Sequence, residues 1–182
     1  MNLKKFALTV STLAILGTPA LANPMVGGAA MFPSRDIIDN AVHSKDHTTL
    51  VAAVKAAGLV ETLKGKGPFT VLAPTNEAFA ALPAGTVENL LKPENKATLV
   101  KILTCHVIAG DVMASTIMKM AKDDGGMHEV KTVGGCKLWL STKGGKVEIK
   151  DEAGGTATVT IADVKQSNGV IHVVNHVLLP KM

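Results

Sequence analysis

Pairs of glycines recur every ten residues in the last third of the chain, at positions 134–135, 144–145 and 154–155. The segments that follow them, residues 136–140, 146–150 and 156–161, alternate apolar and polar side chains. Such alternation is typical of strands with one buried face, and glycine-containing turns commonly connect antiparallel neighbours. The pattern therefore predicts an antiparallel meander, with a strongly apolar strand after it over residues 170–179.

The chain before the meander is predicted to be mainly helical. Ser34 is the expected cap of a first helix, Asp46 is the expected cap of a second over residues 47–57, and Gly58 ends that helix. Further helices are expected at residues 59–64, 76–82, 86–91, 93–104 and 114–122, with strands at 69–72 and 105–108. Helices that precede a run of strands favour an α+β domain.

The N-terminus has the pattern of a secretory signal peptide. Lys4 and Lys5 precede an apolar or small run over residues 6–17, and Ala20-Leu21-Ala22 forms a small-residue cleavage motif. The run is shorter than the ~20 apolar residues that span a bilayer, so an uncleaved anchor is the weaker alternative. The expected organisation is a signal peptide over residues 1–22, a flexible lead segment over 23–33, and one domain over 34–182 that does not span a membrane.

Charge and aromatic content limit the classes of partner. The chain has 19 basic and 15 acidic residues, and removal of Lys4 and Lys5 leaves 17 against 15, a net charge of +2. A nearly neutral chain without a long basic run lacks the electrostatic footprint of a nucleic-acid-binding protein. With one Trp, four Phe and no Tyr, the chain also offers few aromatic platforms on which sugars or bases could stack.

Cys105 and Cys136 are the two cysteines of the sequence, and an exported chain would meet an oxidising compartment. We expect a disulfide between them, which would stabilise the fold by about 3.5 kcal/mol in the chain-entropy model. The alternative is a pair of buried free thiols. The sequence has no C-x-x-C, which disfavours a thioredoxin-like redox centre.

Two longer segments resemble a specific family. Residues 67–79 read GPFTVLAPTNEAF, and residues 168–180 read NGVIHVVNHVLLP. They resemble, in order, the first and second signature boxes of fasciclin domains. Residues 105–107, Cys-His-Val, stand where the family typically has Tyr-His-Val. Over residues 34–180 the chain is similar to the single-domain fasciclin proteins of bacteria.

This resemblance implies a fold and a role. The implied fold is a wedge of about seven strands flanked by helices, and the implied role is adhesion between cells, or of cells to matrix and to other proteins. In this sequence the first box is a strand-to-helix corner in which the Thr75 hydroxyl can cap the helix. We expect structural roles for the box residues Phe69, Thr70, Pro74, Thr75, Asn76, Phe79, Asn168, Gly169 and His172.

The resemblance also implies candidate contact residues. In animal members, integrin binding has been assigned near the Tyr-His pair and to an Asp-Ile dipeptide before the second box. His106 keeps the histidine of the pair, while Cys105 replaces the tyrosine. Asp163 and Val164 fall at the place of the dipeptide, followed by Lys165 instead of an apolar residue. His106, Asp163 and Val164 are therefore candidate binding residues.

Catalytic patterns are absent from the sequence. It contains no G-x-S-x-G and no phosphate loop, and its carboxylate pairs fall in predicted turns. His172 and His176 lie ~13 Å apart on one strand face, too far to share a zinc ion. We expect His172 to be buried and hydrogen-bonded. The sequence thus predicts a protein without enzymatic activity, metal site or cofactor.

One metal alternative stays open. Met118, Met120, Met127 and His128 could form a soft copper(I) site. Methionines more often fill a core or pack along an edge.

Trp139 is the best candidate for a surface contact. Leu138 and Leu140 share the predicted inward face of their strand, so Trp139 and Lys137 lie on the other face. An exposed Trp beside a Lys is typical of a contact hot spot, unless a helix of the same domain covers the ring. We expect a secreted or periplasmic adhesion module that binds a cell-surface or extracellular protein or glycan. The alternative is a carrier of an apolar, carotenoid-like molecule, which an apolar groove between helices and sheet would favour.

Overall fold

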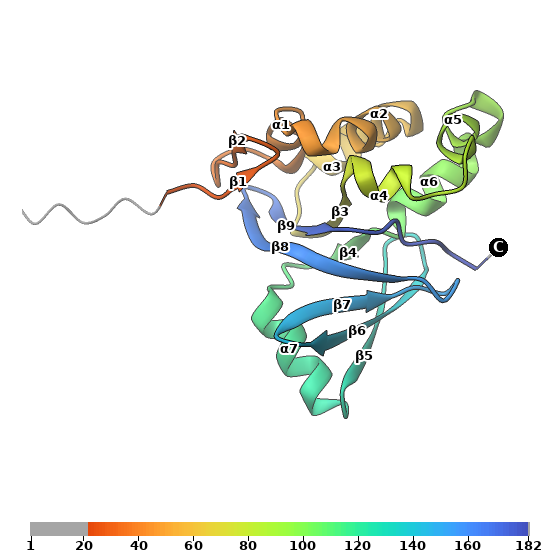
Figure 1. Ribbon diagram of the computed structural model, residues 1–182. Coiled ribbons are helices and arrows are strands. Elements are labelled where there is room, and N and C mark those ends of the chain that lie inside the picture. Colours follow the sequence, from red (N-terminus) through yellow and green to blue (C-terminus); the bar gives the residue numbers. More distant parts are fainter. Residues whose placement is uncertain (1–21, 182) are drawn as a thin grey trace, which may run out of the picture.

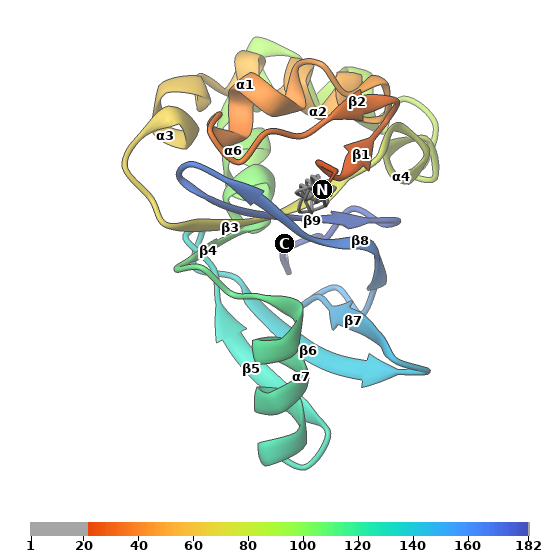
Figure 2. The ribbon, with the colours of Figure 1, turned by 90° about the vertical axis from the view of Figure 1, so that its left-hand side faces the viewer.

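The computed structural model describes residues 22–181. The expected signal peptide lies outside the described residues, except for Ala22. The α-helices are α1 (Ile37–Ala41), α2 (Thr48–Ala57), α3 (Val60–Lys64), α4 (Asn76–Ala80), α5 (Thr86–Leu90), α6 (Lys96–Thr104) and α7 (Ala114–Asp123). Two short 3₁₀ helices, η1 (Lys45–His47) and η2 (Pro93–Asn95), precede α2 and α6. Helices α1–α6 form one layer, and α7 lies apart from them against the meander (Figures 1 and 2).

Seven strands form one sheet in the order β4-β3-β9-β8-β7-β6-β5. They are β3 (Phe69–Pro74), β4 (Val107–Ala109), β5 (Met127–Lys131), β6 (Lys137–Lys143), β7 (Lys146–Lys150), β8 (Thr156–Gln166) and β9 (Gly169–Val174). The pair β3–β9 is parallel and all other pairs in this sheet are antiparallel. The predicted α+β class, seven-stranded wedge and antiparallel meander are confirmed.

The sheet separates two cores. The first core lies between the helical layer and β3 and β9, and the second core lies between α7 and the meander. Strand β3 serves both, because Val71 faces the first core while its neighbour Leu72 faces the second. A strand buried on both faces is expected to be continuously apolar, as the sequence of β3 nearly is.

Several predicted boundaries differ from the structure. Asp36, not Ser34, caps α1, because the Asp36 side chain accepts a hydrogen bond from Asp39 N. Cys105 is the C-cap of α6 rather than the first residue of a strand. Strand β5 was not predicted, since its sequence MHEVK is too polar to show a clear apolar face.

Residues 23–33 do not stand apart from the domain as the expected lead segment would. Strands β1 (Met25–Val26) and β2 (Ala29–Ala30) form a short antiparallel pair, and Val26 and Met31 are buried in the first core. Lys45 N donates a hydrogen bond to Gly27 O, which ties the segment to the start of η1. The ordered domain therefore begins before Ser34. The burial of Val26 and Met31 was not predicted, because the segment is rich in glycine and small residues and has no apolar periodicity.

Candidate functional site

The first box forms the strand-to-helix corner that the sequence predicts. Thr75 caps α4 by accepting a hydrogen bond from Ala78 N. The Asn76 side chain accepts from Thr49 N at 3.0 Å and donates to Lys45 O at 2.8 Å, so it joins α4 to the start of α2. The Thr70 hydroxyl is fully buried and donates to Gly110 O at 2.7 Å. These polar groups are therefore used in hydrogen bonds within the domain.

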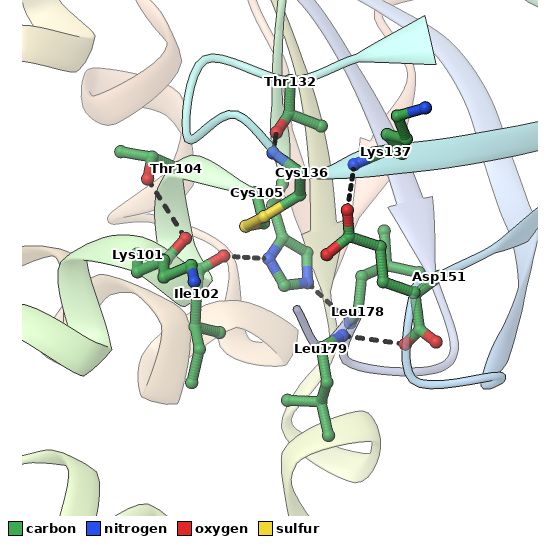
Figure 3. The surroundings of a disulfide bond; sticks show 12 residues. Lys101, Ile102, Thr104, Cys105, Thr132, Cys136, Lys137, Asp151, Leu178 and Leu179 are labelled. Carbon is green, nitrogen blue, oxygen red and sulfur yellow. Dashed lines mark hydrogen bonds between the residues drawn. A yellow bond between two sulfur atoms is a disulfide. The ribbon is translucent and has the colours of Figure 1, made fainter. Parts of the chain in front are cut away.

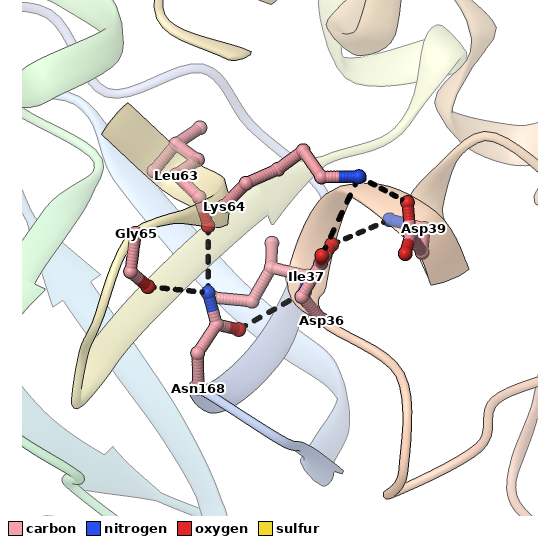
Figure 4. Close-up of polar contacts among 7 residues, drawn as sticks. All are labelled: Asp36, Ile37, Asp39, Leu63, Lys64, Gly65 and Asn168. Carbon is pink, nitrogen blue, oxygen red and sulfur yellow. Dashed lines mark hydrogen bonds and ion pairs between the residues drawn. The ribbon is translucent and has the colours of Figure 1, made fainter. Parts of the chain in front are cut away.

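Asn168 of the second box joins three separate segments (Figure 4). Its Oδ1 accepts from Ile37 N at 3.1 Å, and its Nδ2 donates to Leu63 O at 2.7 Å and to Gly65 O at 3.1 Å. These contacts link the β8–β9 turn to the start of α1 and the end of α3. The side chain serves as a structural hub rather than a ligand-binding group.

His172 is fully buried and hydrogen-bonded, as the sequence predicts. Its Nδ1 accepts from Asp163 N at 3.2 Å, and its Nε2 lies 2.7 Å from Val112 O. Because a carbonyl oxygen only accepts and a backbone N–H only donates, these contacts select the neutral tautomer protonated at Nε2. His172 thus anchors the loop before α7 to the sheet.

The Asp163-Val164 dipeptide is not a free surface pair. Val164 is fully buried in the first core. Asp163 has a positive φ of 59° where the β8–β9 register is irregular, and its Oδ1 accepts from Ala114 N at 2.7 Å. It therefore caps the first residue of α7 from a distant part of the sequence, and its negative charge favours the N-terminus of that helix. Only part of its side chain is left for a partner.

His106 is also part of the interior. Its side chain is 2% exposed, Nδ1 lies 2.8 Å from Ile102 O, and Nε2 accepts from Leu178 N at 2.9 Å. Burial lowers the pKa of His106 to about 4, so the ring is neutral near pH 7. The expectation that His106 contacts a partner is corrected by this burial, since the ring occupies a hydrogen-bonded position inside the domain.

The predicted disulfide between Cys105 and Cys136 is confirmed (Figure 3). Their Cα atoms are 5.4 Å apart, and both residues are buried. The bond joins the end of α6, in the helical layer, to the residue before β6, in the meander. The Thr132 hydroxyl accepts from Cys136 N at 3.0 Å and fixes the adjacent turn.

Trp139 lies on the outer face of the meander, which we define as the outward sides of β5, β6 and β7. Helix α7 packs on the opposite side of these strands, and no helix within residues 22–181 covers the outer face (Figures 1 and 2). The indole is partly exposed and borders a hollow of about 410 Å³ beside residues 150–154. The alternative of a helix covering the ring is therefore excluded for the described part of the chain.

Lys137 lies on the same face, two residues from Trp139. Its side chain is 55% exposed, and its Nζ is 2.9 Å from Glu129 Oε1. This contact raises the pKa of Lys137, since the Glu129 carboxylate favours the charged ammonium. The structure thus brings Trp139 and Lys137 together, and it places His106 and Val164 in the interior.

Asp151 and Glu152 have roles that the sequence did not reveal. Asp151 is buried, and its carboxylate accepts from Gly155 N at 2.6 Å and from Leu179 N at 2.8 Å. Glu152 accepts from Lys137 N and Lys181 N, and these contacts lower its pKa. The two carboxylates hold the C-terminal segment against the β7–β8 turn. An Asp before a Gly-Gly turn was the available signal, because such a side chain often binds the turn's backbone.

The methionine cluster considered for copper is not assembled. On β5, Met127 pairs with Ser141 and His128 pairs with the buried Leu140, so these two side chains point to opposite faces. Within residues 22–181, no group of three or more His, Cys, Asp or Glu side chains has the arrangement of a metal site.

A mainly apolar cavity of about 70 Å³ lies between the helical layer and the sheet. Its walls include Ile38, Leu50, Leu63 and Val71. Sites for small molecules usually enclose about 300–1,000 Å³, so this space is too small for a carotenoid-like ligand. The structure gives no support to the carrier alternative.

No helix within residues 22–181 is long and apolar enough to cross a membrane.

Comparisons with known proteins agree with this geometry. A family model described as "Fasciclin domain" matches residues 45–180. A protein from Synechocystis sp. named sll1483 is 46% identical over 185 residues, which cover 97% of this chain and 96% of the relative. The transforming growth factor-beta-induced protein ig-h3 of Sus scrofa is 38% identical over 148 residues, which cover 81% of this chain but 20% of the relative.

A solved structure of a FAS1 domain pair from the insect cell adhesion molecule Fasciclin I has the same fold, with a TM-score of 0.57 at 24% identity. The match covers 71% of this chain and 43% of the solved chain, so this chain spans less than half of it. The architecture is thus an α+β domain of the FAS1 type. The chain belongs to the fasciclin domain family.

Proposed function

We propose that this protein is an exported, non-enzymatic adhesion module that binds an extracellular partner through the outer face of the meander. The observation that carries the proposal is the uncovered, partly exposed Trp139 on a face that no described helix covers. His106 and Val164 are buried, and Asp163 accepts a hydrogen bond from Ala114 N, so the fold takes up much of these three candidates. Lys137 lies on the same outer face as Trp139 and is exposed. Of the candidate residues, those on the outer face remain free to bind a partner.

The rigidity of this face supports a binding role. The inward neighbours of Trp139, Leu138 and Leu140, are fully buried under α7, and the disulfide fixes the start of β6. Trp139 therefore sits on a preorganised strand rather than on a loop. Binding then orders few backbone atoms, which lowers the entropic cost of association.

The absence of enzymatic activity is supported by how the polar groups are used. The side chains of Thr70, Asn168 and His172 are hydrogen-bonded to backbone groups, so none is an activated nucleophile or a free general base. Fasciclin domains are generally adhesion modules without catalytic activity, and the Fasciclin I structure comes from a cell adhesion molecule.

A cell-binding assay tests the site. Purified residues 23–182 are labelled and compared with Trp139→Ala for binding to host cells or matrix. Truncation of a central Trp should weaken binding about ten-fold or more. Phe32→Ala is the matched control, because Phe32 is an aromatic residue 37% exposed near the helical layer. Equal binding by wild type and Trp139→Ala, with both folded, would overturn this choice of site.

Export is tested separately. The full chain is expressed in a bacterial host, and the mature N-terminus is sequenced from the periplasmic and culture fractions. We expect the sequence to begin at Asn23. Full-length protein retained in the cytoplasm would contradict export.

Catalysis is tested with panels of hydrolase and oxidase substrates. We expect no turnover above background. Turnover that a single polar substitution abolishes would overturn the non-enzymatic proposal.

A further inference from the structure

The outer face of the meander carries a charge pattern that points to one class of partner. We propose that this face binds an acidic, linear polysaccharide, such as a polymer of uronic acids. Trp139 stacks on one sugar ring, and lysines on either side of it pair with the carboxylates. This inference rests on the proposed function, because it names the partner of the same face.

Lysines dominate the outward side chains of β5, β6 and β7. The strand alternation turns five lysines and two glutamates to the outer face, a net charge of +3: Lys131, Lys137, Lys143, Lys146, Lys150, Glu129 and Glu148. The chain without residues 1–22 has a net charge of only +2. The rest of the domain is therefore slightly acidic, and the positive potential is concentrated on this face.

The lysines form two clusters with Trp139 between them. Lys131 and Lys137 are cross-strand partners near one end of β6, and Lys143 and Lys146 are partners at the other end. Like charges directly opposite on a sheet destabilise it. Within residues 22–181, no ion pair involves Lys143 or Lys146. An anionic ligand would relieve the repulsion at both ends.

The spacing of the clusters indicates a polymer. Lys137 and Lys143 are six residues apart on β6, which is about 20 Å along a strand. A single sugar cannot reach both clusters, whereas an extended chain lying along β6 can. Lys137 is held by one exposed ion pair with Glu129, and because such pairs contribute little free energy, the ammonium is free to exchange partners.

The hollow beside Trp139 fits a sugar ring. Its volume of about 410 Å³ lies within the usual range for ligand sites, ~300–1,000 Å³. Met127 and residues 150–154 border it with Trp139, so it has apolar walls, the ammonium of Lys150 and two carboxylates. Asp151 is buried, and Glu152 already accepts hydrogen bonds from Lys137 N and Lys181 N. The face of an indole ring is electronegative, and it attracts the weakly positive C–H groups of a pyranose.

Other macromolecules fit this face less well. Cores of protein interfaces are depleted in Lys and Glu, while here Trp139 and Met127 are the two large apolar side chains among the outward positions of β5–β7. Single-stranded nucleic acids usually stack on several aromatic residues, and this face has one.

The intrinsic fluorescence of the chain reports on this site, because Trp139 is its only Trp and it has no Tyr. Intrinsic fluorescence of residues 23–182 is followed during titration with polygalacturonate. The matched control polymer is fully methyl-esterified polygalacturonate, which keeps the sugar rings and removes the charges. We expect a saturable spectral change with the acid, weakened about ten-fold or more by esterification and by added salt.

Variants test the lysine clusters. Lys143→Ala/Lys146→Ala lies away from the hollow and should weaken polygalacturonate binding about ten-fold or more, with a smaller salt dependence. The control, Lys55→Ala/Lys96→Ala, removes the same charge from α2 and α6 and should bind as wild type. Thermal melts of all variants confirm that they are folded.

The outcomes separate the two proposals. Equal affinity for the esterified polymer, or tighter binding of a single-stranded oligonucleotide, would overturn the acidic polysaccharide. Trp139-dependent cell binding without any response to polygalacturonate would overturn this inference and leave the adhesion site standing. A fluorescence response to polygalacturonate, combined with cell binding that does not need Trp139, would support the polysaccharide site and overturn the proposed adhesion site.

Discussion

The helical side and the meander side of this domain use their polar residues in opposite ways. In the first core region, Asn168 and Asn76 direct their side chains to backbone groups of neighbouring segments. On the meander, one face is packed under α7 and the other keeps its charged side chains for solvent. The helical side carries the two signature boxes, and their polar side chains are used in hydrogen bonds that hold the fold together. The meander has no such signature, and its outer face keeps the side chains that can bind a partner.

Gly169→Ala should have the largest effect, because it attacks the contact between β3 and β9. A Cβ on Gly169 would overlap the carbonyl oxygen of Phe69, and the φ of 154° disfavours other residues. The atoms that this Cβ would meet are backbone atoms of Phe69 and not the end of a flexible side chain, so the backbone would have to move. We expect a loss of more than about 4 kcal/mol in the free energy of unfolding, measured by denaturant titration.

Gly154→Ala is the matched control on the meander side. Gly154 also has a positive φ, 93°, but a Cβ there would meet open space. We expect a cost of about 1 kcal/mol. Similar losses for the two variants would contradict a tight backbone contact between β3 and β9 at Gly169.

Removal of the disulfide should have the next largest effect, since the bond joins the two sides. The chain-entropy model gives about 3.5 kcal/mol for a loop of this length, 31 residues of sequence separation. Cys105→Ala/Cys136→Ala should lose this amount in denaturant titration, and reduced wild type should match the variant. If the oxidised and reduced proteins unfold at the same midpoint, the two sides do not depend on this bond.

Acid should lower the free energy of unfolding through His106, whose ring connects α6 to the C-terminal segment. The buried ring has a pKa of about 4, below its ordinary 6.5, so the unfolded chain binds the proton more tightly. Stability is therefore complete above about pH 6.5 and is lost as the pH falls toward 4, by about 3 kcal/mol. Protonation at Nε2 would also set N–H against N–H of Leu178.

His106→Gln separates this effect from the titration of carboxylates. The amide keeps hydrogen-bonding groups but does not titrate. The difference in unfolding free energy between pH 7 and pH 4 should be smaller in this variant than in wild type. Identical pH profiles for the two proteins would contradict a neutral, buried His106.

The sequence predicted the fold well where local rules and tertiary packing agree. The meander followed from alternation and glycine turns, and Gly58 ended α2 in the left-handed conformation. The corner at Thr75 formed as expected, because a capping hydroxyl acts within three residues. Each of these signals involves residues close together in the chain, so it can be recognised in a single sequence.

The sequence failed where a residue's role depends on distant segments. Asp163 caps α7 across 49 positions, and His106 binds Leu178 N across 72 positions. No local pattern in the sequence states these partners. The two residues were contact candidates only through the resemblance to fasciclin domains. Trp139 was placed on the correct face because strand alternation is local. The lysine clusters around it emerged only when the register between strands was known.

Trp139→Ala should have the smallest effect on stability, and this sharpens the contrast between the two faces of one strand. Trp139 lies opposite Glu129 of β5 and Lys150 of β7, and each such cross-strand pair contributes at most about 1 kcal/mol. Leu140→Ala, on the buried face of the same strand, should cost about 2–5 kcal/mol. Denaturant titrations followed by circular dichroism measure both variants, since the first one lacks the fluorescent reporter. A loss at Trp139 as large as that at Leu140 would mean that the indole stabilises the fold, and the outer face would then be no freer to bind than the helical side.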